Sequence, residues 1–171
     1  MAEMLDIIDE NNNVIGRETR ERCFNEGLLH RAIHILILNS KGQVLLQKRS
    51  MKKKTFPGFW TSSVSGHVES GKSYEEGAIR EMKEEIRAKT NLEKVCDFFI
   101  EEKYGILIDK EIIRLFSGKY DGPFSIDKNE LDEVRFFYKE ELNDLIRKEE
   151  IIVTPAFLKC WRKLNSKKLN L

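Results

Sequence analysis

The stretch Gly66–Ala88, GHVESGKSYEEGAIREMKEEIRA, decides how the rest of this 171-residue chain is interpreted. Ser73 and Glu76 have the spacing of a capping box, in which each side chain accepts a hydrogen bond from the other residue's backbone N–H. This pair predicts a helix that begins directly after Ser73. Apolar residues then recur at helical spacing and predict a face that packs on a core: Ala78, Ile79, Met82 and Ile86.

A neighbouring face of the same helix gathers three carboxylates. Glu81, Glu84 and Glu85 share an arc of about 100° with Gly77. Like charges at this spacing repel one another by roughly a few tenths of a kcal/mol per pair. A divalent cation bound between the carboxylates would make their clustering favourable instead. Mg²⁺ prefers such hard oxygen ligands and commonly also holds substrate phosphates. The alternative is a solvated acidic face, since 35% of the residues are charged.

With its preceding loop, this helix resembles the signature of the Nudix hydrolases, G-x5-E-x7-R-E-U-x-E-E-x-G-U, in which U is aliphatic. The matching positions are Gly66, Arg80, Glu81, Met82, Glu84 and Glu85. The resemblance implies a site for Mg²⁺ or Mn²⁺ whose ligands are the Gly66 carbonyl, Glu81, Glu84 and Glu85. It also implies that Arg80 holds a carboxylate in place.

Three residues depart from the signature. Lys72 replaces an acidic residue, which removes an auxiliary carboxylate and places a cation near the site. Arg87 replaces the closing glycine, so a natural left-handed stop is missing. We therefore expect the helix to continue to about Thr90 or Asn91. Ala88 is small for the last aliphatic position.

The composition limits the classes of protein to consider. A length of 171 residues fits one domain, with its core at about 28–145. The net charge of +1, with both signs spread along the chain, argues against a nucleic-acid polymer and against attraction to a membrane. The longest apolar runs have the length of strands, so we expect a cytoplasmic protein. The three cysteines lack the spacing of a zinc site or a disulfide framework.

The order of patterns along the chain predicts an α/β fold. The expected strands cover an N-terminal hairpin at 4–18 and then residues 32–38, 43–48, 61–64, 95–101, 106–116 and 134–138. We expect 32–38 and 43–48 to form a central hairpin. A helical turn is expected before Gly27, and C-terminal helices lie within 139–165, followed by a basic tail that ends at residue 171. A mixed sheet with helices on both sides is an α/β/α sandwich, which the family resemblance also implies.

Further charged residues are candidates for the same site. The loop 49–60 carries a run of cations, of which Arg49 and Lys54 are candidate phosphate contacts, although charge runs are often simply solvated. Asp109 and Glu111 lie two residues apart and point to the same side of their strand. If that side faces the helix carboxylates, one of them completes a metal cluster or acts as a general base. If it faces water, both are ordinary edge-strand charges.

A narrower resemblance gives a second interpretation. The segments LLHRAIHILILNSKGQVLLQKR and KKKTFPGFWTSSVSGHVESG are similar to the type 1 isopentenyl diphosphate isomerases and to their nearest Nudix hydrolases. In these isomerases a Cys precedes the Gly-His pair and transfers a proton, and a metal lies among several His and two acids. Here Ser65 replaces that Cys and Cys23 replaces one His. The retained positions are His30, His67, Asp109 and Glu111.

The chemistry of position 65 favours hydrolysis. A hydroxyl is a far weaker acid than a thiol, whose pKa is about 8.5. We therefore predict a Mg²⁺-dependent pyrophosphohydrolase that cleaves a nucleoside diphosphate linked to another moiety, or a similar organic diphosphate. The alternatives are the isomerase and a non-catalytic module that binds a diphosphate. The expected partner is this small molecule, and a homodimer through exposed strand edges is a further option.

The predicted roles can be stated residue by residue. The catalytic candidates are Arg80, Glu81, Glu84 and Glu111, with the general base among the three glutamates. The candidate substrate contacts are Arg49, Lys54 and His67. A second site would include His30 and Asp109.

Overall fold

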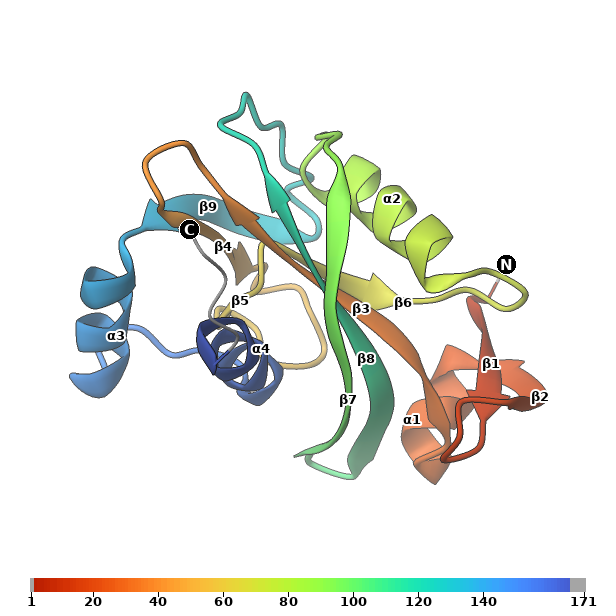
Figure 1. Cartoon of the computed structure of the whole chain (residues 1–171). Helices are drawn as coiled ribbons and strands as arrows, with labels where there is room; N and C mark the ends of the chain where they lie inside the picture. The colour runs from red at the N-terminus through yellow and green to blue at the C-terminus, as the bar shows by residue number, and fades with distance from the viewer. Residues whose placement is uncertain (1, 167–171) are drawn as a thin grey trace.

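A mixed sheet with helices on both faces forms the centre of the computed structural model, which describes residues 2–166 (Figure 1). The strands are β1 (Met4–Ile8), β2 (Val14–Thr19), β3 (Leu29–Leu38), β4 (Val44–Arg49), β5 (Trp60–Thr61), β6 (Val64–His67), β7 (Leu92–Tyr104), β8 (Leu107–Lys119) and β9 (Leu131–Phe137). The helices are α1 (Arg20–Glu26), α2 (Tyr74–Glu85), α3 (Lys139–Arg147) and α4 (Pro155–Ser166). Within residues 2–166, no helix is both long and apolar enough to cross a membrane. Of the predicted basic tail, residues 167–171 lie outside the described part.

Strand β3 organises the sheet. It runs parallel to β8 from the pair Leu29–Lys110 to the pair Leu38–Lys119, and antiparallel to β6. Strands β3 and β4 are antiparallel neighbours at the centre of the sheet, as predicted for 32–38 and 43–48, but their ladder is short and is registered only at Leu38 and Val44. Further along the same edge β4 pairs with β5, while its other edge pairs with β9 from Val44 to Arg49. The divergence leaves β3 free to pair with β6, which carries the start of the signature.

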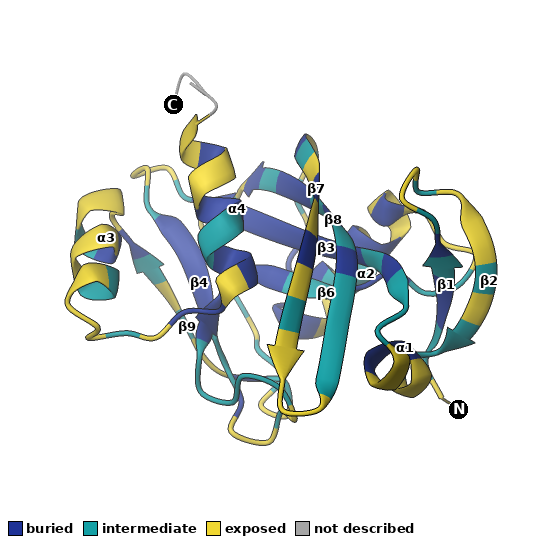
Figure 2. Cartoon of the chain, turned by 90° about the horizontal axis from the view of Figure 1, so that it is seen from below, coloured by how far each residue is buried: buried dark blue, intermediate teal, exposed yellow. Residues whose placement is uncertain are grey.

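Alternation along β3 gives the sheet two apolar faces. Ala32 and Leu36 belong to a core with α4, whereas Ile33, Ile35 and Ile37 belong to a core with α2. Successive side chains of a strand point to opposite faces, so one strand serves both cores. Figure 2 shows β3 and β4 buried between these layers and β2 exposed at the edge. The predicted α/β/α sandwich is confirmed.

Helix α2 begins where the capping box predicts. The Ser73 hydroxyl accepts from the Glu76 N–H at 3.1 Å, and the Glu76 carboxylate accepts from the Ser73 N–H at 2.9 Å. The predicted continuation to residue 90 or 91 was wrong, because α2 ends at Glu85 and Arg87 adopts a φ of +50°. The loop before β9 satisfies this helix end, since Ser125 N donates to the Ile86 carbonyl at 3.1 Å. Arg87 therefore takes the left-handed conformation that usually falls to glycine.

The buried face of α2 differs from the predicted one at a single position. Ala78, Met82 and Ile86 are buried as expected, but Ile79 is 59% exposed. The inward row includes Gly77, where a Cβ would lie 3.3 Å from Val68 Cγ2. The helix therefore approaches the signature loop through Gly77, and Ile79 is turned toward solvent.

The predicted N-terminal hairpin is present, and its first strand supports the signature loop. Asp6 is 8% exposed and accepts hydrogen bonds from Ser70 Oγ at 2.6 Å and Gly71 N at 3.0 Å. The Met4 carbonyl accepts from Ser70 N at 2.8 Å. Strand β1 thus fixes the loop that enters α2.

We expect Asp6→Ala to lower the free energy of unfolding by about 1–3 kcal/mol, because it leaves the Gly71 N–H and the Ser70 hydroxyl without their acceptor. Urea denaturation followed by circular dichroism measures this loss. Glu10→Ala, an exposed acid in the turn of the same hairpin, is the matched control and should change stability by less than about 0.5 kcal/mol. Equal stability of Asp6→Ala and the wild type would contradict the supporting role of β1.

Candidate active site

A pocket of about 790 Å³ gathers segments that are far apart in the sequence. Its lining comes from the signature loop and α2, the N-terminal hairpin, the loop between β4 and β5, and the hairpin of β7 with β8. Most of the predicted site residues line it: His30 and Lys54 are the exceptions. His30 lies directly beneath the lining, fully buried.

The three signature carboxylates occupy different environments. Glu85 is 6% exposed, and its Oε2 accepts from Ser65 N and from Gln47 Nε2, each at 3.1 Å. The side chain of Glu81 is 12% exposed and that of Glu84 is 57% exposed. Glu81 and Glu85 are therefore held inside the pocket, and Glu84 lies at its rim.

Arg80 connects two of these carboxylates to the signature loop. Its Nη2 donates to Glu81 Oε1 at 2.7 Å and to the His67 carbonyl at 2.9 Å, while Nη1 donates to Glu84 Oε2 at 2.8 Å. These contacts are what the predicted positioning role of Arg80 requires.

Gly66 lies directly against Glu81. A Cβ at position 66 would lie 2.2 Å from both Cδ and Oε1 of Glu81, far inside van der Waals contact. The absence of a side chain at Gly66 is therefore what allows Glu81 to rest against the backbone of β6.

Lys72, which replaces the early signature acid, points away from these groups. Its Nζ pairs with Glu76 Oε1 at 3.3 Å on the exposed surface of α2, and Lys72 does not line the pocket. The expectation of an added cation at the site was wrong, because the capping box draws Lys72 toward Glu76.

Burial disfavours the ionised forms of Glu81 and Glu85 and so raises the pKa of each. It raises the pKa of Glu85 to about 8, with the nearby Glu81 acting in the same direction. It raises the pKa of Glu81 to about 7, although Arg80 opposes the shift. A bound divalent cation would favour the ionised forms of both groups.

This burial gives an expected pH dependence for the metal-free protein. The neutral forms of Glu81 and Glu85 are favoured by folding, so their contribution to stability is fully present below the unfolded pKa of 4.5 and is lost as pH rises through about 7 and 8. The unfolding temperature in EDTA should therefore fall as the pH rises from about 4.5 to about 8, and these two groups should add no further fall above that. Glu85→Gln, which cannot ionise, should show a smaller fall. An identical pH profile for the variant would contradict the assignment.

Four other side chains form a second cluster at the floor of the pocket. His30, His67, Asp109 and Glu111 each offer a ligand atom, and these atoms all lie within 4.8 Å of one another. His30 Nε2 is 3.3 Å from Asp109 Oδ1, and His67 Nε2 is 3.3 Å from Glu111 Oε1. Strand β8 lies between β3 and β7, so its two acids face the pocket instead of an open edge.

The donor set of this second cluster fits a metal ion. His30 Nδ1 lies 2.8 Å from the Leu28 carbonyl, which can only accept, so Nδ1 is the donor of this bond and Nε2 is the ring nitrogen that faces the cluster. Within residues 2–166, His30 Nε2 and Asp109 Oδ1 are buried without a hydrogen-bond partner. Burial also lowers the pKa of His67 well below its usual value, which favours the neutral ligand form. A cation coordinated by His30 Nε2 and Asp109 Oδ1 would satisfy these two atoms.

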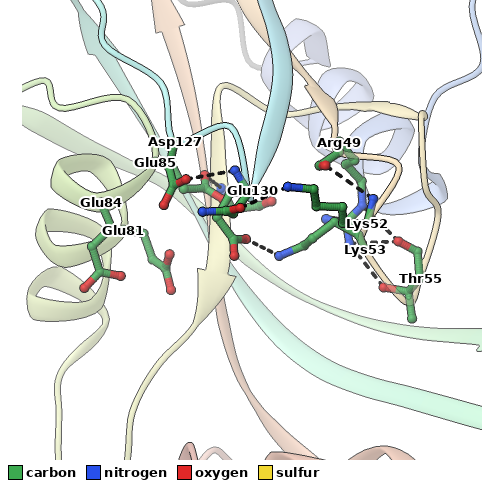
Figure 3. A network of polar contacts seen from close by, with 12 residues as sticks. Arg49, Lys52, Lys53, Thr55, Glu81, Glu84, Glu85, Asp127 and Glu130 are labelled. Carbon is green, nitrogen blue, oxygen red and sulfur yellow. Dashed lines mark hydrogen bonds and ion pairs between the residues drawn. The ribbon is translucent and has the colours of Figure 1, made fainter.

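The loop between β4 and β5 supplies positive charge. Arg49 lines the pocket, and its Nη2 donates to the Thr55 carbonyl at 2.9 Å. Lys53 also lines the pocket and pairs with Glu130, whereas the predicted contact Lys54 lies outside the lining. Figure 3 shows this loop facing the carboxylates of α2, with Glu130 between the two groups.

The pocket lining includes residues that the sequence patterns did not indicate, among them Glu102 and His34. Glu102 lies across the β7–β8 ladder from Asp109, and its Oε1 accepts from Ala156 N at 2.8 Å. His34 is 6% exposed, with Nδ1 at 2.8 Å from Ser62 Oγ, and burial lowers its pKa to about 3. The available signal was the alternation of β3, since His30 and His34 share a face.

Comparison with known proteins agrees with this architecture. Residues 28–157 match the NUDIX domain. The chain is 37% identical over 123 residues to an isopentenyl-diphosphate Delta-isomerase of Serratia proteamaculans (strain 568), covering 71% of this chain and 69% of the relative. It is 34% identical over 147 residues to an uncharacterized Nudix hydrolase of Yersinia pestis, covering 83% and 76%. The crystal structure of DR0079 from Deinococcus radiodurans superposes with a TM-score of 0.78 at 22% identity, covering 94% of this chain and 98% of that one.

The family match spans most of the chain and includes both carboxylate clusters of the pocket. The chain belongs to the Nudix hydrolase family, close to its members that resemble isopentenyl diphosphate isomerase.

Proposed function

We propose that the protein is a metal-dependent pyrophosphohydrolase that cleaves the diphosphate bond of a nucleoside diphosphate linked to another moiety, or of a similar organic diphosphate. The proposal rests on the composition of the pocket lining. The signature carboxylates and the cations Arg49 and Lys53 line the same pocket, so ligands for a metal and contacts for phosphate oxygens face a common space.

Two ligand groups support Mg²⁺ or Mn²⁺ at this site. The first would be the Gly66 carbonyl with Glu81, Glu84 and Glu85. The second would be His30, His67, Asp109 and Glu111. When bound, such ions neutralise the charge of a diphosphate and lower the pKa of a bound water.

In this proposal, basic side chains position the phosphate groups and a glutamate accepts the proton of the attacking water. Arg49 and Lys53 offer positive charge to the phosphate oxygens, which is the main electrostatic need of phosphoryl transfer. Among the candidate bases, Glu81 suits the role best, because its carboxylate lies inside the pocket against Gly66 and is held there by Arg80. Glu84 lies at the exposed rim, and Glu111 is committed to the second cluster.

The isomerase is the second candidate, and the intact second cluster favours it. The similarity to isomerases points the same way. Against it stands Ser65, whose hydroxyl lines the pocket where the isomerases carry a thiol. Such a hydroxyl is a poor acid–base for carbon without a dedicated partner.

A paired assay tests the proposal. A panel of organic diphosphates is incubated with Mg²⁺ or Mn²⁺, and release of phosphate or nucleoside monophosphate is measured beside isomerisation of isopentenyl diphosphate. Hydrolysis of a panel member without isomerisation is the expected result. Isomerisation without hydrolysis by the wild type would overturn the proposal. The Ser65→Cys variant shows whether isomerisation needs only the missing thiol.

A further inference from the structure

One wall of the pocket is aromatic. Phe56, from the loop between β4 and β5, and Tyr104, at the end of β7, both line it. Their ring centroids lie 5.3 Å apart with an interplanar angle of 59°. Phe59 also packs against Phe56, with ring centroids 5.5 Å apart. Two distant segments therefore meet through their rings at the edge of the site.

Hydrogen bonds hold the loop that presents Phe56. Gly58 N donates to the Arg49 carbonyl at 3.0 Å, and Arg49 N donates to the Phe59 carbonyl at 2.8 Å. Phe56 has a φ of +49°, which is unfavourable for a residue with a bulky side chain. The surrounding hydrogen bonds therefore hold the backbone at Phe56 in a conformation that a bulky residue rarely adopts.

The same loop connects the Phe56 ring to Arg49, the proposed phosphate contact. The Arg49 guanidinium donates through Nη2 to the carbonyl and the hydroxyl of Thr55, at 2.9 and 3.2 Å. Thr55 directly precedes Phe56 in the chain. A ligand whose phosphate contacts Arg49 would therefore have its organic part near Phe56 and Tyr104.

Phe24 is a further ring in the described lining, but its surroundings leave little room for a ligand. It is 7% exposed and packs against His30 and His67 at centroid distances of 5.8 and 5.5 Å. The Arg20 guanidinium covers it at 5.3 Å. Tyr104, by contrast, is 39% exposed. The pair of Phe56 and Tyr104 is thus the better surface for a planar group.

We propose that Phe56 and Tyr104 select a diphosphate whose organic part carries a planar aromatic ring, as a nucleobase does, over one that carries an alkyl chain. This inference rests on the proposed function for the position of the phosphates. Stacking of a base on an aromatic side chain typically strengthens binding by about tenfold or more, and it tolerates different bases because each has a π face. Discrimination against an alkyl diphosphate follows from the lack of such a face.

Binding of non-hydrolysable analogues tests the inference without requiring turnover. Calorimetry with Mg²⁺ compares the α,β-methylene analogues of ADP and UDP with methylenediphosphonate on the wild type, Phe56→Leu and Tyr104→Leu. Leucine keeps an apolar side chain but removes the π face. Tyr138→Leu, at a 49% exposed tyrosine outside the pocket lining, is the matched control.

The wild type should bind at least one nucleotide analogue about tenfold more tightly than methylenediphosphonate, and each pocket variant should lose most of that advantage. Binding of methylenediphosphonate and the behaviour of Tyr138→Leu should stay within about twofold of the wild type. Equal losses for both kinds of ligand, or unchanged nucleotide binding in both pocket variants, would overturn the inference. Unchanged circular dichroism establishes that the variants fold.

Hydrolysis assays distinguish a failure of the aromatic subsite from a failure of the proposed hydrolase activity. A nucleotide preference that depends on Phe56 and Tyr104, with no hydrolysis of any diphosphate, would support the aromatic subsite and overturn the hydrolase. Hydrolysis at equal kcat/KM for nucleoside-linked and alkyl diphosphates would support the hydrolase and overturn the subsite.

Discussion

Glu85→Gln should lower the rate of diphosphate hydrolysis by about a thousandfold or more. A bound metal contributes several kcal/mol to catalysis, and each 1.4 kcal/mol is worth about tenfold in rate. Glutamine keeps the shape of the side chain and an oxygen that can accept from Ser65 N and Gln47 Nε2, but it removes the charge. The metal-free variant should be at least as stable as the wild type, because it no longer buries a carboxyl whose pKa burial raises to about 8.

The comparison needs two further variants of the same helix. Glu75→Gln changes an exposed carboxylate of α2 that pairs with Arg114 outside the pocket, and it should leave the rate within about twofold of the wild type. The hydrolysis rate of Glu84→Gln should lie between those of Glu85→Gln and Glu75→Gln, since Glu84 is 57% exposed at the rim. Steady-state kinetics at saturating Mg²⁺ and thermal unfolding in EDTA measure both effects. Full activity of Glu85→Gln would remove this carboxylate from the metal site.

Gly66→Ala should reduce hydrolysis by about a hundredfold or more while changing stability by less than about 1.5 kcal/mol. The new methyl group would lie 2.2 Å from Cδ and Oε1 of Glu81, so that side chain must move. These atoms are the far end of a flexible chain, and the fold can yield there without moving β6. The displaced carboxylate would lose its hydrogen bond from Arg80 and its position in the proposed metal site.

Gly16→Ala is the matched control for this change. Its added Cβ would lie at an ordinary 3.7 Å from Ile7, and position 16 lies outside the pocket lining. Kinetics and urea denaturation of both variants compare activity with stability. A Gly66→Ala enzyme that is as active as the Gly16→Ala enzyme would show that Glu81 does not need its position against the backbone.

The local signals in the sequence correctly predicted the start of α2 and the grouping of its three carboxylates on one side of the helix. The capping box of Ser73 and Glu76 depends on residues three apart, and it placed the start of α2 correctly. The grouping of Glu81, Glu84 and Glu85 depends on helical geometry alone, and all three line the pocket. Such features need no information from distant segments.

The features that the sequence left undecided or predicted wrongly depend on residues distant in the chain. The direction in which Asp109 and Glu111 point could not be decided, because it is set by the pairing of β8 with both β3 and β7. The end of α2 at Glu85 depends on Ser125, nearly forty residues later in the chain. The choice of Lys53 over Lys54 at the pocket depends on the shape of a loop and on Glu130.

The loop between β8 and β9 has a consequence for anyone who wishes to modify the protein. Asp127 N donates to the Glu85 carbonyl at 3.3 Å, and the Glu130 carbonyl accepts from Ser50 N at 3.0 Å. One loop therefore touches the backbone of Glu85, a proposed metal ligand, and the start of the loop that carries the proposed phosphate contact Arg49. An inserted tag or label at residues 125–130 would disturb both halves of the site together. The exposed turn 148–150 after α3 makes no such connection within the described chain, and it is the better place for a probe.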